Sequence, residues 1–256
     1  MIALDLPGFG KPENPISHGP GEQLANIVAF LDPMDIAQCD LVGHSMGTLL
    51  ACELATHYPG RVDRLVLSDS PVTSVLGLSR HPWRILSRNP QVATFLVEAL
   101  TAVLRPPWLA RRLILAMSSA RWLALRAYVF RPAALSIEDM TGMLDGAGAP
   151  GAWPTLRKWF GYDPQPALAG VRQPILVIHG ERDTICPLDD VHLLVASNRA
   201  VENVHLIPSV GHVPMIEAPD EFNECVTHFF GQESRPEREE QMSSSALPTP
   251  TTTIDA

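Results

Sequence analysis

The stretch LVGHSMGT, residues 41–48, constrains the fold more than any other part of the chain. An apolar, strand-like run ends at Ser45, and an apolar pattern of helical spacing starts directly after it. A strand that turns at once into a helix forces the corner residue into strained backbone angles and crowds the positions two residues away. Because Gly43 and Gly47 hold those positions, we predict a sharp turn that lifts the Ser45 side chain above a sheet. The N–H groups that begin the helix would then face a negatively charged oxygen formed beside the serine.

The alternation of strand-like and helical patterns runs through most of the chain. Apolar runs that end in polar loops are typical of buried strands, and they alternate with segments whose apolar residues recur at helical spacing. This alternation predicts an α/β fold with a mostly parallel sheet covered by helices on both faces. The stretches with strand character are 2–6, 39–45, 61–71, 173–183 and 203–212, and those with helical character include 21–32, 46–60 and 219–230.

Between residues 72 and 169 the alternation stops. This region consists of several short helical patterns separated by Pro- and Gly-rich breaks, and it holds all five tryptophans. We therefore expect a helical insertion, residues 72–169, between the two parts of an α/β core formed by residues 1–71 and 170–231. Residues 232–256 are polar, rich in Pro, Ser and Thr, and lack apolar periodicity, so they are expected to form a disordered tail.

Two polar side chains are placed to assist Ser45. A nucleophilic serine requires a base, and the base requires an acid that orients it. Asp183 and His212 each follow a predicted strand, where open α/β sheets build their sites, and the order Ser45, Asp183, His212 suits this architecture. Asp69, which also follows a predicted strand, is an alternative to Asp183. Glu217 is expected to fix the loop that carries His212.

The motifs DLPGFG, LVGHSMG, RLVLSDSP, ILVIHGERDTICP and SVGHVPMIEAPDEF together resemble the α/β-hydrolase superfamily, in particular its members with a helical cap inserted into the core. The resemblance implies that Ser45 is the nucleophile, His212 the general base and Asp183 its orienting acid. It also implies that the backbone N–H of Met46 donates to the oxyanion. No metal or organic cofactor is expected, and the sequence contains no HExxH motif.

The reaction implied by this resemblance is the hydrolysis of a carboxylic ester or a related acyl bond, a thioester included, through an acyl-enzyme at Ser45. Acyl transfer and carbon–carbon bond hydrolysis use the same triad and stay open. The alternative function is a non-catalytic or weakly active ligand-binding protein of the same fold.

That alternative arises from the N-terminus. In the family, the stretch that IALDLPGFG resembles is the fourth strand with its loop, and three strands and a His-Gly loop precede it. None of these precedes it here. We expect Ile2 to Leu6 to be a strand without its usual neighbour, so that either the edge of the strand before Ser45 is left unpaired or Ile2 to Leu6 pairs directly with it. The His-Gly loop normally supplies a second oxyanion N–H, and losing one such donor typically lowers turnover about 10²–10³-fold. We favour a truncated start over a chain that has lost catalytic power.

The charge distribution bears on partners. The net charge of −9 at pH 7 argues against nucleic acid. Between Arg80 and Arg131, however, nine Arg and a single acid, Glu98, give a local charge of +8. An Arg-rich cap suits an anionic ester, a thioester on a phosphopantetheine carrier, or an anionic membrane surface. The alternative is a solvated cap face, or neutralisation by acids such as Asp139, Asp145 and Asp163.

The remaining features concern location. No apolar run reaches the ~18 residues of a membrane span, and the N-terminus has no signal-peptide pattern. The four cysteines, Cys39, Cys52, Cys186 and Cys225, have neither paired nor metal-binding spacing. We predict a cytoplasmic protein with free thiols that acts on a small-molecule ester or acyl substrate.

Overall fold

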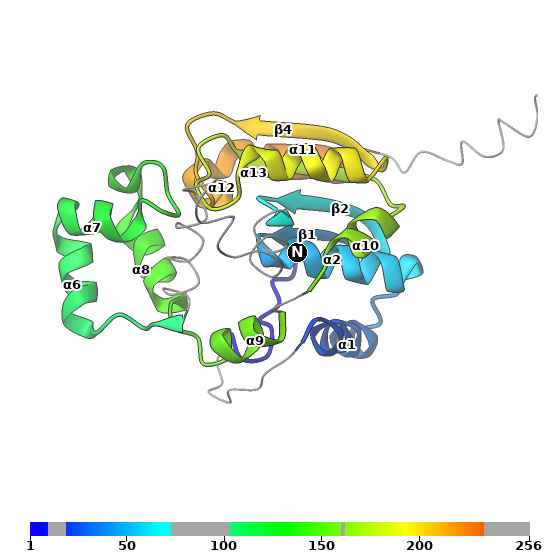
Figure 1. The fold of residues 1–256 in the computed structure, drawn as a ribbon, viewed down its shortest axis with the longest axis horizontal. Coiled ribbons are helices and arrows are strands. Elements are labelled where there is room, and N and C mark those ends of the chain that lie inside the picture. The colour runs from blue at the N-terminus through cyan, green and yellow to red at the C-terminus, as the bar shows by residue number, and fades with distance from the viewer. Residues whose placement is uncertain (10–18, 73–102, 160–161, 233–256) are drawn as a thin grey trace, which may run out of the picture.

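A computed structural model of the chain describes residues 1–9, 19–72, 103–159 and 162–232. Its centre is a sheet of four parallel strands in the order β1-β2-β3-β4 (Figure 1). Strands alternate with helices along the chain, so the predicted α/β fold with a parallel sheet is confirmed. The strands are β1 (Cys39–His44), β2 (Val62–Ser68), β3 (Ile175–Gly180) and β4 (Val201–Ile207).

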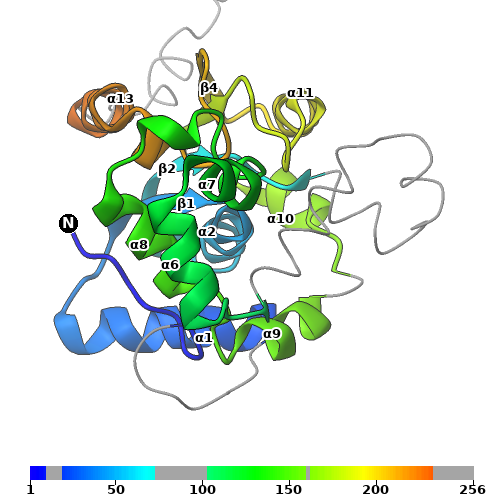
Figure 2. The ribbon, with the colours of Figure 1, turned by 90° about the vertical axis from the view of Figure 1, so that its left-hand side faces the viewer.

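Helices cover both faces of this sheet. Figure 2 shows α13 on one side of the strands and α2, α10 and α11 on the other. The central strands β2 and β3 are buried along almost their whole length, which explains their continuous apolar sequence. The helices that pack on the sheet are α1 (Pro20–Leu31), α2 (Met46–His57), α10 (Gln165–Gly170) and α11 (Leu188–Ser197) on one face and α13 (Pro219–Gly231) on the other.

The N-terminal stretch differs from the prediction. Residues 1–6 form no strand and are mostly exposed. Leu6 instead packs beside Leu49, Leu50 and Trp159. The Gly8 carbonyl accepts a hydrogen bond from the Gly151 N–H at 2.8 Å, outside the sheet. The backbone groups of a strand need hydrogen-bond partners on a neighbouring strand, and no described strand lies beside these residues. The apolar pattern alone was therefore not enough to make residues 2–6 a strand.

As a consequence, β1 has a free edge. Among the described residues it pairs only with β2. Val42, in the middle of β1, is 45% exposed although its register partner Val66 is fully buried. Of the two alternatives expected for this edge, the unpaired edge of β1 agrees with the described residues, and the pairing of Ile2 to Leu6 with β1 is wrong.

Helices α6, α7 and α8 form a group that stands apart from the sheet (Figure 1). Leu125, Val129 and Met140 form their own buried apolar cluster, which also takes in Val213 from the core. Helix α10, near the end of the predicted insertion, packs instead in the main core through Ala167 and Leu168. The helices of this region are α6 (Trp108–Ala116), α7 (Ser118–Leu125), α8 (Ile137–Gly146) and α9 (Ala152–Trp159).

The other elements of the described ranges are short. There, 3-10 turns span Asp32–Met34, Pro59–Arg61 and Pro132–Ala134, and α12 spans Pro214–Glu217. No described helix has both the length and the hydropathy to cross a membrane. Residues 73–102 of the expected cap and 233–256 of the expected tail lie outside the described residues.

Candidate active site

The turn between β1 and α2 has the strained geometry that its sequence predicts. Ser45 has φ 51° and ψ −126°, a left-handed conformation that non-glycine residues rarely adopt. Its N–H donates to the Ser68 carbonyl on β2 at 2.9 Å. Its own carbonyl accepts hydrogen bonds from the Thr48 N–H at 3.0 Å and the Thr48 hydroxyl at 2.6 Å. These bonds on both sides of the corner hold Ser45 in its strained conformation at the start of α2.

The crowding expected at both flanking glycines occurs at one of them. A Cβ on Gly43 would lie 2.7 Å from the Gly47 carbonyl oxygen and 2.8 Å from the Thr48 Cα, so no side chain fits there. A Cβ on Gly47 would have no described heavy atom within 4 Å. Only Gly43 is therefore required by close packing of the turn.

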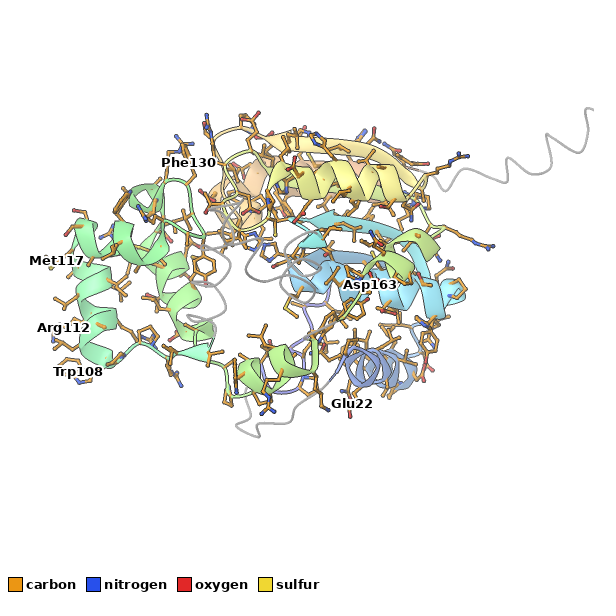
Figure 3. The ribbon with its side chains drawn as sticks, in the orientation of Figure 1. Glu22, Trp108, Arg112, Met117, Phe130 and Asp163 are labelled. Atoms are coloured by element: carbon orange, nitrogen blue, oxygen red, sulfur yellow. The ribbon has the colours of Figure 1, made fainter. Side chains whose placement is uncertain are left out.

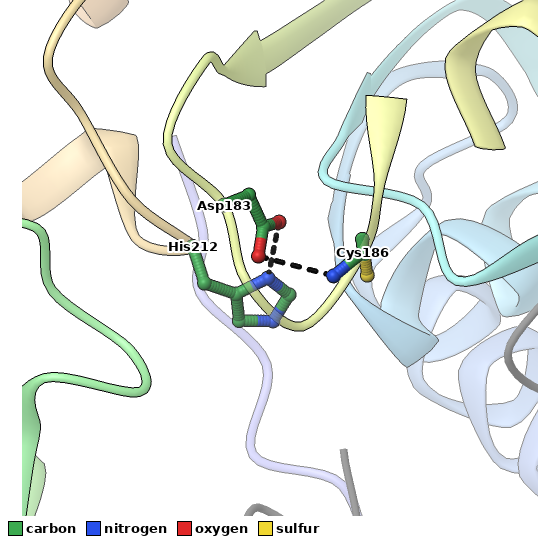
Figure 4. Close-up of side chains that lie close together, drawn as sticks. All are labelled: Asp183, Cys186 and His212. Atoms are coloured by element: carbon green, nitrogen blue, oxygen red, sulfur yellow. Dashed lines mark hydrogen bonds and ion pairs between the residues drawn. The ribbon is translucent and has the colours of Figure 1, made fainter. Parts of the chain in front are cut away.

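Asp183 and His212 meet beyond the ends of their strands (Figure 4). The His212 Nδ1 lies 2.8 Å from Asp183 Oδ2. Asp183 Oδ1 accepts hydrogen bonds from the N–H groups of Ile185 at 2.7 Å and Cys186 at 3.0 Å. Burial raises the pKa of the Asp183 carboxyl, but the charge of His212 and its hydrogen bond outweigh burial and lower the pKa overall. The pair is a buried carboxylate that holds the imidazole with its Nδ1–H toward Asp183.

His44 links the serine turn to the His212 loop. Its Nε2 lies 2.6 Å from the His212 carbonyl oxygen, and the two ring centroids are 4.8 Å apart. Burial, followed by the charge of His212, lowers the pKa of His44 to about 4, so its neutral ring donates this hydrogen bond at pH 7. The contact brings Ser45, which directly follows His44, to the side of the His212 loop.

Asp69, the alternative acid, has other partners. It is completely buried, with φ 50°, and accepts hydrogen bonds from the Ser68 hydroxyl at 2.6 Å and the Gly180 N–H at 3.0 Å. The His179 Nδ1 lies 3.3 Å from Asp69 Oδ1. Burial and the nearby charge of Asp183 raise the pKa of Asp69 well above its ordinary value. The imidazole of His212 is thus bonded to Asp183, while Asp69 joins the ends of β2 and β3.

The same residues form two compact sets of metal-ligand type. The ligand atoms of Asp69, His179 and Asp183 lie within 4.8 Å of one another, as do those of Asp183, Cys186 and His212. No sequence pattern marks these sets, because their members are distant along the chain. Both Asp183 oxygens already accept hydrogen bonds from the chain, so we interpret these sets as a hydrogen-bonded carboxylate–imidazole network.

Residues 127–131 connect α7 to the loops that carry Asp183 and His212. The Ala127 carbonyl accepts a hydrogen bond from the Thr184 hydroxyl at 3.0 Å, next to Asp183. The Tyr128 carbonyl accepts one from the His212 N–H at 2.8 Å. This segment therefore helps to fix the positions of both loops.

Glu217 completes this connection. Its Oε1 accepts from the Gly211 N–H at 2.7 Å, and its Oε2 accepts from the N–H groups of Phe130 at 2.8 Å and Arg131 at 3.4 Å. Burial raises the pKa of the Glu217 carboxyl despite these hydrogen bonds. The sequence-based expectation that Glu217 fixes the His212 loop agrees with these contacts. The sequence did not reveal the contact of His44 or those of the carbonyls in residues 127–131. In each contact the acceptor is a backbone carbonyl, which every residue has.

Comparison with known proteins gives the family. A model of the alpha/beta hydrolase family matches residues 1–225. The chain is 29% identical over 240 residues to a 2-hydroxymuconate semialdehyde hydrolase of a Pseudomonas species, covering 91% of this chain and 76% of that one. It is 26% identical over 236 residues to a pimeloyl-[acyl-carrier protein] methyl ester esterase of Nitrosospira multiformis, covering 88% and 82%.

Solved structures agree on the fold. A meta-cleavage product hydrolase from Pseudomonas fluorescens aligns with a TM-score of 0.63 at 20% identity, covering 89% of this chain and 78% of that one. A thermophilic esterase from Thermogutta terrifontis aligns with a TM-score of 0.60 at 20% identity, covering 90% and 79%. The chain belongs to the alpha/beta hydrolase family. It is an enzyme of the hydrolase type.

Proposed function

We propose that the protein hydrolyses a carboxylic ester or a related acyl bond through a Ser45–His212–Asp183 triad. The observation that carries this proposal is the buried 2.8 Å bond between His212 and Asp183 beside the strained Ser45 turn. A base held in one tautomer beside a half-buried serine at a strained corner is the arrangement that nucleophilic catalysis requires.

The chemistry follows from this geometry. The Ser45 Oγ attacks the acyl carbon, and its proton passes to the His212 Nε2 while Asp183 stabilises the imidazolium. The Met46 N–H, at the first position of α2, donates to the oxyanion, where the helix dipole also favours negative charge. His212 then protonates the leaving alcohol or thiol, and a water molecule activated by His212 releases the acid from Ser45.

The substrate class is proposed from the relatives and the cap. Two of the relatives are named as esterases of pimeloyl-[acyl-carrier protein] methyl ester. A neutral ester is therefore the first substrate to test, and an acyl thioester on a phosphopantetheine carrier the second. Carbon–carbon bond hydrolysis, which the same triad can perform, is the third.

We also propose the organisation and location predicted from the sequence. The core would comprise residues 1–71 and 170–231, and the cap residues 72–169. A cytoplasmic location fits the four free thiols at Cys39, Cys52, Cys186 and Cys225.

The test is covalent labelling of the full chain with a fluorophosphonate, read by intact mass. We expect one adduct on the wild type, none on Ser45→Ala, and one on Ser197→Ala, a matched change of an exposed serine on α11. Ser45→Ala, which forms no adduct, should also fail to hydrolyse short-chain p-nitrophenyl esters. A folded wild type that binds ligands without an adduct or turnover would favour the binding-protein alternative.

A further inference from the structure

The strongest unexplained feature of the surface is the outward face of α6 and α7. An amphipathic helix normally turns its apolar residues toward the core, yet no residue of α6 is buried. Trp108, Leu109 and Leu113 recur at helical spacing and are exposed, with Trp108 at 72%. Figure 3 shows Trp108, Arg112 and Met117 along the outer edge of this helix. On α7, Trp122 and Leu123 are exposed as well.

The same face is basic. Residues 103–131 contain six Arg and no Asp or Glu. Arg105, Arg112 and Arg126 are exposed, and the Arg126 guanidinium lies 4.7 Å from the centroid of the Trp122 ring. Arg111 differs, because it pairs with Asp145 of α8. Exposed arginines thus lie beside exposed aromatic and aliphatic side chains.

A hollow opens on this face. It has a volume of about 690 Å³ and is lined by Arg105, Trp108, Arg111 and Arg112, with Pro106, Leu115 and Ala116. Its guanidinium groups and apolar wall match a phosphate group that is attached to a hydrocarbon chain.

From these observations we propose that the α6–α7 face docks on an anionic phospholipid surface. Trp, Leu and Met side chains would enter the boundary between headgroups and acyl chains while the arginines pair with lipid phosphates. The rest of the chain is strongly acidic, so an anionic surface would repel it and orient the protein with this face inward.

Other partners fit this face less well. In a two-fold contact with a second copy, arginines would face arginines. An acidic carrier protein would satisfy the arginines, but it would leave the protruding Trp and Leu side chains against charged groups. A bilayer meets both requirements, since it offers anionic phosphates above an apolar layer. The docking does not depend on the chemistry proposed for Ser45.

The test is co-sedimentation of the full chain with vesicles of phosphatidylcholine alone or mixed equally with phosphatidylglycerol. We expect binding to the anionic vesicles only, weakened by high salt. Arg112→Glu replaces a positive charge by a negative one, a change of two units, and should weaken binding on the order of tenfold or more. Trp108→Ala combined with Leu113→Ala should weaken it similarly.

Matched controls make the result decisive. Arg199→Glu, at an exposed position between α11 and β4, and Trp153→Ala, an exposed tryptophan on α9, should bind like the wild type. Ser45→Ala should also bind like the wild type, so failed labelling and failed docking are separate outcomes. The proposal is overturned by equal binding to neutral vesicles, by no binding, or by equal effects of the control changes. It is also overturned if an acidic carrier protein binds this face and anionic vesicles do not.

Discussion

At the scale of single residues, the turn at Ser45 depends on Gly43, which has no side chain. Ser45 holds an unfavourable φ of 51°, a conformation that costs of order 1–3 kcal/mol and lasts only where the surroundings enforce it. The close approach of Gly43 to Gly47 and Thr48 is part of that enforcement. Strain at this turn is the reason why the serine side chain projects from the sheet.

Gly43→Ala and Gly47→Ala should therefore differ sharply. The Gly43 change forces a methyl group to 2.7 Å from a carbonyl oxygen, and we expect it to destabilise the fold by about 1–3 kcal/mol or more. The Gly47 change meets no neighbour within 4 Å and replaces a helical glycine, so stability should stay equal or rise by about 0.5–1 kcal/mol. Urea unfolding measures both values. A similar loss in the two variants would show that crowding at Gly43 is not the cause.

Substitutions of the two buried carboxyl groups, Asp183 and Asp69, should have different effects on activity. Asp183→Asn removes the acceptor for the His212 Nδ1–H and favours the wrong tautomer, so we expect ester hydrolysis to fall on the order of 10³–10⁴-fold. Asp69→Asn leaves that bond in place, and activity should stay within about tenfold of the wild type. Steady-state kinetics of the two isosteric variants decides which carboxylate orients the base. The reverse order of effects would assign the acid to Asp69.

Asp69→Asn should also change how stability depends on pH. Its pKa is raised in the folded protein, so the folded state binds more protons than the unfolded one, and stability falls as pH rises from about 4 through that raised pKa. Asparagine imitates the protonated acid and should remove this fall. Thermal unfolding between pH 5 and 8 should show a higher melting temperature for Asp69→Asn at the upper end. An equal slope in both proteins would contradict a raised pKa.

At the scale of elements, the 127–131 segment and Glu217 hold the His212 loop from the side of α7. Glu217→Ala leaves the N–H groups of Gly211, Phe130 and Arg131 without their acceptor. We expect kcat to fall about tenfold or more with little change in KM, since the base moves and the substrate pocket does not. Glu217→Gln keeps an amide oxygen and should recover part of the loss. Glu224→Ala, on the exposed side of α13, is the matched control and should be neutral.

The elements differ in how well the sequence foretold them. Strands β1 to β3 and the turn at Ser45 were predictable because local patterns specify them: an apolar run, a corner and a helical period. Asp183 and His212 followed from their places after strands. Ile2 to Leu6 has the same local pattern as a strand, but whether it pairs depends on a neighbour that local pattern does not reveal. The bond from Phe130 to Glu217 joins residues 87 positions apart, and nothing local marks it.

At the scale of the whole molecule, we expect self-association to begin at the edge of β1 that has no partner among the described strands. Unpaired backbone groups beside an exposed Val42 offer a site for pairing with another chain. Val42→Lys should reduce association at high protein concentration while leaving fluorophosphonate labelling of Ser45 intact. Sedimentation velocity over a concentration series measures this effect. Leu193→Lys, at an exposed position of helix α11, serves as the control, and an equal effect there would exclude β1 as the contact.

The hydrogen bonds from residues 127–131 to the loops of Asp183 and His212 have a consequence for protein engineering. A segment grafted from a relative in place of residues 127–131 would bring a different backbone to Thr184 and His212. The three residues proposed as a triad would all be present in that chimera, yet the Thr184 hydroxyl and the His212 N–H would need new acceptors. Under the proposed mechanism, exchanging this segment therefore also shifts the loop that carries the base.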